Sequence, residues 1–429
     1  IRGGDDQNFD IKTLFYQSGD FFCSEMKFEV DMLIPTTGMD GWGAIAVAER
    51  TYLKYELHLQ YKDANKDYKG GYVEVAFEAL SPLEHESAKQ NLGFGMDSAW
   101  LDSVLQGRDG SGTYISTGNH NGVVEIKRHG DQKNGNVTSY VASKLKRTVL
   151  SSFHNAQYPT GFLVRNEMLS WKLLMLEPKA LRQPDAFKDS TATITGEGRH
   201  LPATIHRLSR NKVLPDVEQT IANRLSELID DKFELEIDQD DKRELYTLYL
   251  RGKDGTAHSA KVLSDGTLRF LALTTIETDP DFTGLIGLEE PENGIHPDRI
   301  DAMIELLRDI AMDTEEAIDE TNPFRQVIIN THSPLVVVKL KPEEILVSKE
   351  KKSKINEQQY KGTVFQSIQG TWRTKMGQEE SKPTPHAMDL KELHQYMSTP
   401  NAITTRSSGG KNLVQQLSTD QPLEGQLAS

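Results

Sequence analysis

Four consecutive residues, Ser264-Asp265-Gly266-Thr267, stand at the start of a run typical of a helix. A serine in this position accepts a hydrogen bond from the backbone, while the first N–H groups of the helix stay free. Those N–H groups and the positive end of the helix dipole attract anions such as phosphate. An ordinary helix cap uses the same residues, so the segment alone indicates either a phosphate site or a simple cap.

A second segment ends in two adjacent glutamates, Glu289 and Glu290, which follow the apolar residues 285–288. Two carboxylates at the end of a buried strand repel each other unless a cation or a proton offsets their charge. The pair therefore suits a Mg²⁺ ion and the activation of a water molecule. The competing interpretation is ordinary surface acidity.

A third segment is the apolar run Val327-Ile328-Ile329 followed by Asn330-Thr331-His332-Ser333-Pro334. His332 is predicted to lie just beyond a strand end, and Ser333 with Pro334 is typical of the beginning of the next helix. A single histidine in such a place is more often structural than functional. The order and spacing of the three segments on successive elements favour a common functional site more strongly than any one segment does.

In this order, the three segments resemble the signature motif, the Walker B segment and the switch histidine of ABC-type ATPase heads of the SMC, RecF and OLD-like group. The resemblance implies an ATPase that binds ATP and Mg²⁺. It implies that Glu289 coordinates Mg²⁺ through water, that Glu290 is the general base and that His332 contacts the γ-phosphate. The residues implied to contact the nucleotide of a second copy are Ser264, Asp265, Gly266 and Thr267.

The residues after the glutamates extend this resemblance and also show where the chain departs from transporter ATPases. Glu292, Asn293 and His296 resemble the D-loop region of OLD-like ATPases. Glu289 replaces the usual aspartate, and Asp265 replaces the second residue of the Ser-Gly-Gly common in transporters. A transporter function is therefore disfavoured.

The elements that must position these segments follow from hydrophobic periodicity. Alternating residues between 21 and 80 predict an antiparallel sheet, and Leu173, Leu174 and Leu176 suggest an apolar helical stripe. Residues 215–229 predict an amphipathic helix, and residues 233–250 predict two paired strands. Beyond them, helices at 267–276 and 297–310 alternate with buried strands at 285–288 and 327–329, which predicts a doubly wound parallel sheet.

The resulting fold class is α/β, a P-loop NTPase fold by resemblance. The N-terminal lobe is antiparallel β, the arm is short and helical, and the C-terminal lobe has a parallel sheet. The expected domains are residues 1–140, 141–210, 211–375 and 376–429, the last a tail or partner-binding segment. No Gly-x-x-x-x-Gly-Lys-Ser/Thr string occurs. The expectation is that this loop precedes Ile1, and the alternative is a degenerate head that binds nucleotide weakly or not at all.

Composition limits the class of protein. A formal net charge of −15 opposes general coating of nucleic acid, although a local basic groove at Lys127, Arg128, Lys144, Lys146 and Arg147 stays open. The single cysteine, Cys23, excludes an intrachain disulfide and favours a reducing, cytoplasmic setting. No apolar run is long enough to span a membrane.

The leading hypothesis is an ATPase that pairs with itself and controls an effector, expected to be a nuclease, in bacterial defence. It rests on similarity to the ATPases of anti-phage systems such as Septu, PARIS and retron modules. The alternatives are a repair or recombination ATPase that grips DNA, and an assembly scaffold whose nucleotide is structural.

Overall fold

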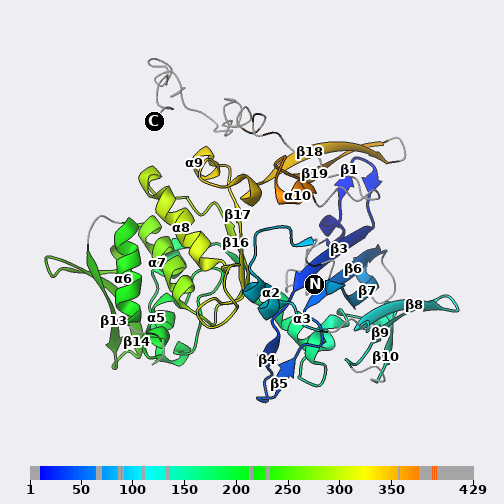
Figure 1. Cartoon of the computed structure of the whole chain (residues 1–429), viewed down its shortest axis with the longest axis horizontal. Helices are drawn as coiled ribbons and strands as arrows, with labels where there is room; N and C mark the ends of the chain where they lie inside the picture. Colours follow the sequence, from blue (N-terminus) through cyan, green and yellow to red (C-terminus); the bar gives the residue numbers. More distant parts are fainter. Residues whose placement is uncertain are drawn as a thin grey trace.

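The computed structural model divides into a β-rich N-terminal lobe and a helix-rich C-terminal lobe, with the parallel strands β16 and β17 between them (Figure 1). The structure describes the following residues: 10–63, 70–85, 88, 91–107, 112–131, 136–211, 214, 216–228, 232–355, 358–375, 389, 391 and 393. Most of the predicted tail at 376–429 lies outside them. Among the described residues, no helix combines the length and the apolar character needed to cross a membrane.

The N-terminal lobe is built on a six-stranded antiparallel sheet in the order β10-β9-β8-β7-β6-β3. Its strands are β3 (Glu25–Leu33), β6 (Tyr52–Lys62), β7 (Tyr72–Pro82), β8 (Ile115–His120), β9 (Val123–Arg128) and β10 (Thr138–Val141). Asn121 and Gly122 both have positive φ and form the tight turn between β8 and β9, as the Asn-Gly pair predicts. The antiparallel sheet expected from the sequence is confirmed.

Shorter elements surround this sheet. The hairpin β4–β5 and helix α3 contribute to the core of the lobe, where Ile34, Leu53 and Phe153 are fully buried. The bounds are η1 (Ile11–Leu14), β1 (Gln17–Ser18), β2 (Phe21–Phe22), β4 (Thr37–Met39), β5 (Ile45–Val47), α2 (Ser98–Val104), η2 (Ala142–Lys144), η3 (Leu150–Ser152) and α3 (Pro159–Ser170).

A three-stranded parallel sheet, β11-β16-β17, carries two of the motif segments. It comprises β11 (Lys172–Leu174), β16 (Gly284–Glu289) and β17 (Arg325–Asn330). The two strands predicted at 285–288 and 327–329 are confirmed and pair directly, Leu288 opposite Ile329. The helical stripe predicted for Leu173 and Leu174 was wrong, because both lie in β11 and pair with β16.

The C-terminal lobe packs its helices around α7, whose side chains from Leu268 to Ile276 are largely buried. The amphipathic helix α6 and the hairpin β13–β14 form as predicted, with Ile221 and Leu225 fully buried. The bounds are α4 (Pro178–Leu181), β12 (Asp185–Ala186), η4 (Phe187–Asp189), α5 (Leu201–Ser209), α6 (Val217–Leu228), β13 (Phe233–Asp240), β14 (Leu245–Gly252), β15 (Ala257–Ser259), η5 (Ala260–Val262), α7 (Asp265–Thr278), η6 (Pro297–Arg299), α8 (Ile300–Ile310) and α9 (Pro334–Val337).

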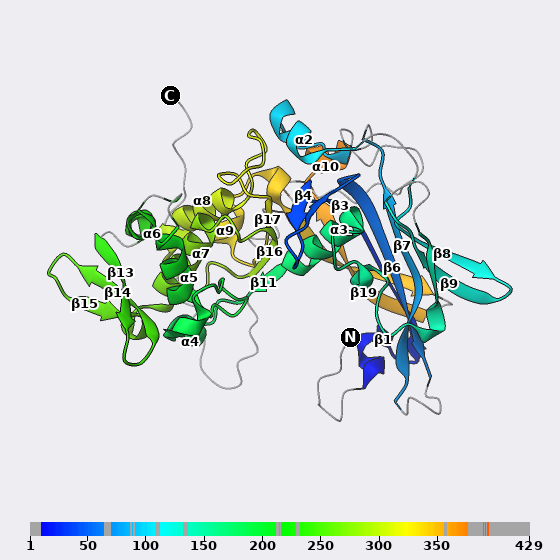
Figure 2. The ribbon, with the colours of Figure 1, turned by 90° about the horizontal axis from the view of Figure 1, so that it is seen from below.

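After α9 the chain returns to the N-terminal lobe. It forms η7 (Pro342–Glu344), the antiparallel hairpin β18 (Leu346–Ile355) and β19 (Gln358–Ser367), and α10 (Trp372–Lys375). Tyr360 of β19 stacks on Phe21, and the backbone of Lys361 exchanges hydrogen bonds with the Tyr16 hydroxyl. Figure 2 shows the hairpin alongside the large sheet and α10 beside α2. The lysine-rich run that begins at residue 349 lies within the paired strand β18 and not at a hairpin tip.

Candidate functional site

Helix α7 begins at the predicted signature segment. Ser264 is its N-cap, and its Oγ accepts a hydrogen bond from the backbone N–H of Thr267 at 3.1 Å. The same Oγ lies 2.7 Å from the Thr267 hydroxyl. Ser264 and Asp265 are exposed, whereas Gly266 and Thr267 are buried. The first turn of the helix therefore presents its N-cap serine and its first residue outward and anchors the next two.

The start of α7 packs against the loop that follows β16. A Cβ atom on Gly266 would lie 2.4 Å from the carbonyl oxygen of Gly294, so only glycine fits at this close approach. One turn further along α7, Arg269 Nη1 donates a hydrogen bond to the carbonyl oxygen of Asn293 at 2.7 Å. The signature segment and the residues identified with the D-loop region are thus in direct contact.

The two glutamates stand where β16 ends. Glu289 is the last residue of the strand and is exposed, and it pairs with Asn330 of β17. Glu290 has a positive φ of 46°, a backbone conformation that residues other than glycine rarely adopt. Its N–H donates to the carbonyl oxygen of Asn330 at 2.7 Å, and its carbonyl oxygen accepts from the N–H of Asn293 at 3.0 Å. The chain therefore turns sharply at Glu290 while staying tied to β17.

The third segment meets this turn through two side-chain contacts. His332 Nδ1 forms a hydrogen bond with Glu290 Oε1, and the Thr331 hydroxyl donates to Glu292 Oε1. Thr331 Oγ1 also accepts the N–H of Ser333 at 3.0 Å. The His332 side chain is 79% exposed and that of Glu290 is 32% exposed. The Glu290 carboxylate is thus within reach of a ligand arriving from solvent, with the histidine beside it.

The structure therefore brings most of the predicted site residues into one connected set. The loop 290–295 contacts the start of α7 on one side and residues 331–332 on the other. His296 stands apart as the N-cap of η6, where its Nδ1 accepts the N–H of Asp298 at 3.3 Å. The structure records no contact between His296 and either glutamate, Glu289 or Glu290.

Glu289 is the residue that fits a magnesium ion. Among the described residues, no three side chains of His, Cys, Asp or Glu are grouped so as to hold a metal by themselves. Mg²⁺ commonly takes only one or two protein carboxylates and completes its shell with water and substrate phosphates. An exposed carboxylate at the end of β16 satisfies that requirement.

Two residues near the motifs were not identified as site residues from the sequence. Thr331 lies within the quoted Thr-His-Ser-Pro string, so its contact with Glu292 had a local signal. Arg182 had only a weak one, because it lies 83 residues before Asp265, with which it forms an ion pair at 2.6 Å. Such a distant pairing cannot be read from periodicity or spacing.

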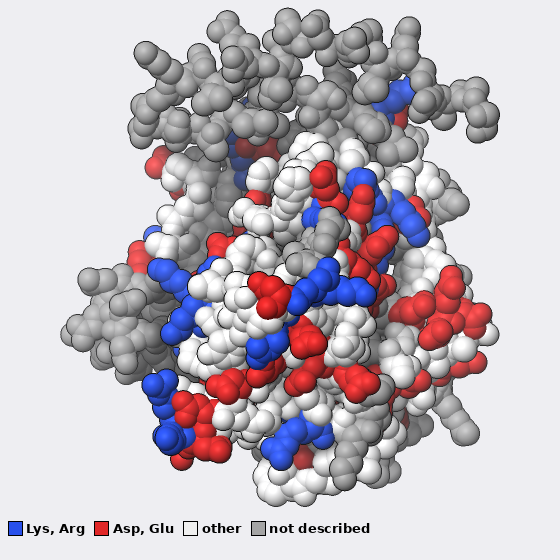
Figure 3. Space-filling view, turned by 90° about the vertical axis from the view of Figure 1, so that its left-hand side faces the viewer, with Lys and Arg blue, Asp and Glu red and all other residues white. Residues whose placement is uncertain are grey.

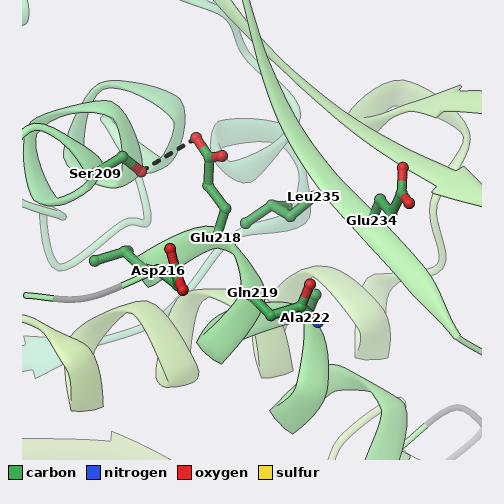
Figure 4. A pocket seen from close by; sticks show the side chains of 8 residues that line it. Ser209, Asp216, Glu218, Gln219, Ala222, Glu234 and Leu235 are labelled. Carbon is green, nitrogen blue, oxygen red and sulfur yellow. Dashed lines mark hydrogen bonds between the residues drawn. The ribbon is translucent and has the colours of Figure 1, made fainter.

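A cavity of about 380 Å³ lies away from the motifs, between the end of α5, the start of α6 and β13 (Figure 4). It is lined by Ser209, Asp216, Val217, Glu218, Gln219, Ala222, Glu234 and Leu235. Ser209 donates a hydrogen bond to Glu218 at 3.1 Å. No motif residue lines this cavity, and its three carboxylates disfavour an anionic ligand. The candidate site is therefore the set of motif segments.

The predicted basic groove is only partly available. Arg128 lies 4.4 Å over the ring of Tyr158 and donates hydrogen bonds to Tyr158 and Ser152, so it supports the lobe. Lys144, Lys146 and Arg147 are exposed. Acidic and basic side chains are interspersed on the face of the C-terminal lobe seen in Figure 3.

Comparisons with known proteins find a family match over part of the chain and similar solved structures. Residues 142–338 match the family described as "AAA domain, putative AbiEii toxin, Type IV TA system". Similar solved structures include an Smc head bound to the C-terminal winged-helix domain of ScpA, at 10% identity and a TM-score of 0.33, covering 70% of this chain and 77% of the other. The SMC head domain from Thermotoga maritima matches at 12% identity and a TM-score of 0.23, covering 71% and 97%.

A search of curated proteins finds no match. The matched family segment runs from η2 to α9 and includes β11, β16 and β17. It therefore contains every motif residue discussed above, and this part of the α/β chain is similar to an AAA domain.

Proposed function

We propose that this chain is an ATPase head that dimerises on ATP, with the start of α7 in one copy closing over a nucleotide held by the other. The observation that carries the proposal is the connected set formed by the start of α7, the loop 290–295 and residues 331–332. Ligands of parallel α/β sheets bind beyond the carboxyl ends of the strands, and both β16 and β17 end at this set.

Each residue has a distinct part in the proposal. Glu290 accepts a proton from the attacking water and orients it, while His332 contacts the γ-phosphate beside it. Glu289 would hold Mg²⁺, which when bound neutralises phosphate charge. Ser264, the exposed N-cap, offers its hydroxyl at the positive end of α7 to the phosphates of the partner's nucleotide, and Gly266 keeps that end close to the loop 290–295.

The test is Glu290→Gln in a protein that includes a phosphate-binding loop. Removing a general base lowers turnover by about 10²–10⁴-fold, so hydrolysis should fall by at least about 100-fold. ATP-dependent dimers should persist and live longer, as size-exclusion chromatography would show. Glu305→Gln, at an exposed position of α8, is the matched control and should hydrolyse ATP normally. Unchanged hydrolysis by Glu290→Gln would remove this residue from the base role.

We further propose that turnover controls a partner effector, a nuclease, in bacterial defence. The support is the family that residues 142–338 match, whose description names a toxin of a toxin–antitoxin system. Co-expression with the product of the neighbouring gene should give a complex whose nuclease activity changes with Glu290→Gln. A complex whose nuclease activity ignores both ATP and that substitution would contradict the control role.

A second candidate function is a DNA-gripping repair ATPase, which the exposed Lys144, Lys146 and Arg147 favour. It predicts DNA binding that weakens steeply with salt and with charge removal at these three positions. A third candidate, an assembly scaffold, predicts that nucleotide-dependent assembly persists in a full-length protein without measurable turnover.

A further inference from the structure

The end of α7 proposed to bind phosphate contains a negatively charged residue, Asp265, which is unexpected beside an anionic ligand. Asp265 is the first residue of α7, and its side chain is 57% exposed. A carboxylate in the first turn is favourable for an isolated helix because it faces the positive end of the dipole. It is unfavourable once a phosphate approaches the same N–H groups, because the two anions repel each other.

Arg182 forms an ion pair with Asp265. Its Nη2 donates to Asp265 Oδ1 at 2.6 Å and to the carbonyl oxygen of Leu263 at 2.8 Å. It therefore binds the residues on either side of Ser264. The Arg182 side chain is 24% exposed, so solvent screens the pair less than a fully exposed one.

The base of this arginine is fixed by packing. Arg182 is the C-cap of α4, which packs against α7. The preceding residue, Leu181, is fully buried in the core that also holds Leu268 of α7. The backbone from which the guanidinium reaches the segment 263–265 is therefore already ordered.

We propose that Arg182 is a positioning residue that neutralises Asp265 and fixes the Leu263–Asp265 backbone, so that the start of α7 accepts the triphosphate held by a second copy. The inference rests on the proposed function. It makes an asymmetric prediction about the pair: losing the arginine weakens nucleotide-dependent dimerisation, whereas losing the aspartate does not. A purely structural ion pair would respond alike to the loss of either partner.

The experiment measures the ATP concentration that half-saturates dimerisation, in a protein that includes a phosphate-binding loop. Arg182→Gln keeps a hydrogen-bond donor and removes the charge, and it should raise this concentration about fivefold. Asp265→Asn should lower this concentration, because it removes a negative charge that repels the approaching triphosphate. The double variant should return to within about twofold of wild type, because the uncompensated carboxylate is gone.

The matched control is Arg251→Gln. Like Arg182, Arg251 donates to one carboxylate, that of Glu236 at 2.6 Å, and to one carbonyl oxygen, that of Gly255 at 3.1 Å. It lies on β14, in the hairpin β13–β14, away from the motif segments. The Arg251→Gln variant should dimerise like wild type. Thermal unfolding of every variant identifies loss of folding, and Asp265→Asn, which leaves Arg182 intact, carries the test if Arg182→Gln does not fold.

Three results would overturn the inference while leaving the proposed function intact. Arg182→Gln could dimerise like wild type, the double variant could stay as weak as Arg182→Gln, or Asp265→Asn could be weakened as much as Arg182→Gln. A wild-type protein that does not dimerise with ATP would instead overturn the proposed function, and this inference with it.

Discussion

Glu78 in the N-terminal sheet and Glu290 after β16 are both glutamates that bond to distant parts of the chain, yet their surroundings are opposite. Glu78 is fully buried and accepts the N–H groups of Val149 at 2.6 Å and Leu150 at 2.8 Å. The Tyr55 hydroxyl donates a third hydrogen bond to it at 3.1 Å. Glu290 is partly exposed, and the hydrogen bond recorded for its side chain is to a histidine that is itself mostly exposed.

The difference separates a carboxylate that supports the fold from one that is available to a ligand. The Glu78 oxygens are committed to holding β7 against the start of η3. The Glu290 side chain stays accessible, and its backbone is held in a conformation that costs free energy. Three experiments test this contrast, in order of decreasing effect on stability.

Glu78→Ala should give the largest effect. It leaves two buried N–H groups and a buried hydroxyl without their acceptor, and each such group costs about 1–3 kcal/mol. We expect the free energy of unfolding to fall by about 3 kcal/mol or more, measured by urea denaturation. Glu125→Ala in β9 is the control, since Glu125 accepts one exposed hydrogen bond from Ser139. An equal loss in the two variants would refute the structural role of Glu78.

The pH dependence of stability should also report on Glu78. Burial raises the pKa of its carboxyl above the ordinary value of 4.5, although hydrogen bonds from Leu150 and Val149 oppose the shift. The folded protein then keeps a proton that the unfolded chain has lost, so stability falls as pH rises through the window above 4.5. Urea unfolding at about pH 4 and about pH 7 should show wild type losing stability relative to Glu78→Gln. A gain in the stability of wild type relative to Glu78→Gln over this pH range would contradict the raised pKa of Glu78.

Glu290→Gly should give the smallest effect, and one of opposite sign. Glycine adopts positive φ without steric cost, so unfolding should become harder by up to about 1 kcal/mol. The lost contact with His332 is exposed and contributes little. Glu290→Ala loses the same contact and keeps the unfavourable φ, so thermal unfolding should place it below Glu290→Gly. The reverse order would show that the turn at Glu290 is not strained.

Sequence patterns predicted those parts of the molecule that depend on local order. The strands β16 and β17 and the helix α6 follow from periodicity within a short window. Residues 173–174 were misassigned because a strand of three residues is too short to show a period that separates it from a helix. Their pairing with β16, more than 100 residues later, decides the conformation.

The contacts within the site depend on tertiary structure and left little trace in the sequence. Glu290 meets His332 across 42 residues, and Arg182 meets Asp265 across 83. Arg128 looked available for DNA because its charge is visible in the sequence, whereas the ring of Tyr158 beneath it is not. Residue type therefore indicated the chemistry, and the fold decided which charges are free to take part.

The rings of Tyr16, Phe21 and Tyr360 pack together, so an early and a late segment of the described chain are in contact. Any rotation of the C-terminal lobe against the large sheet must either separate these rings or bend the segment between α9 and β18. That segment is itself tied to α8 by the ion pairs Arg308–Glu344 at 2.9 Å and Lys339–Asp301 at 2.8 Å, so the connection between the lobes is anchored at both ends.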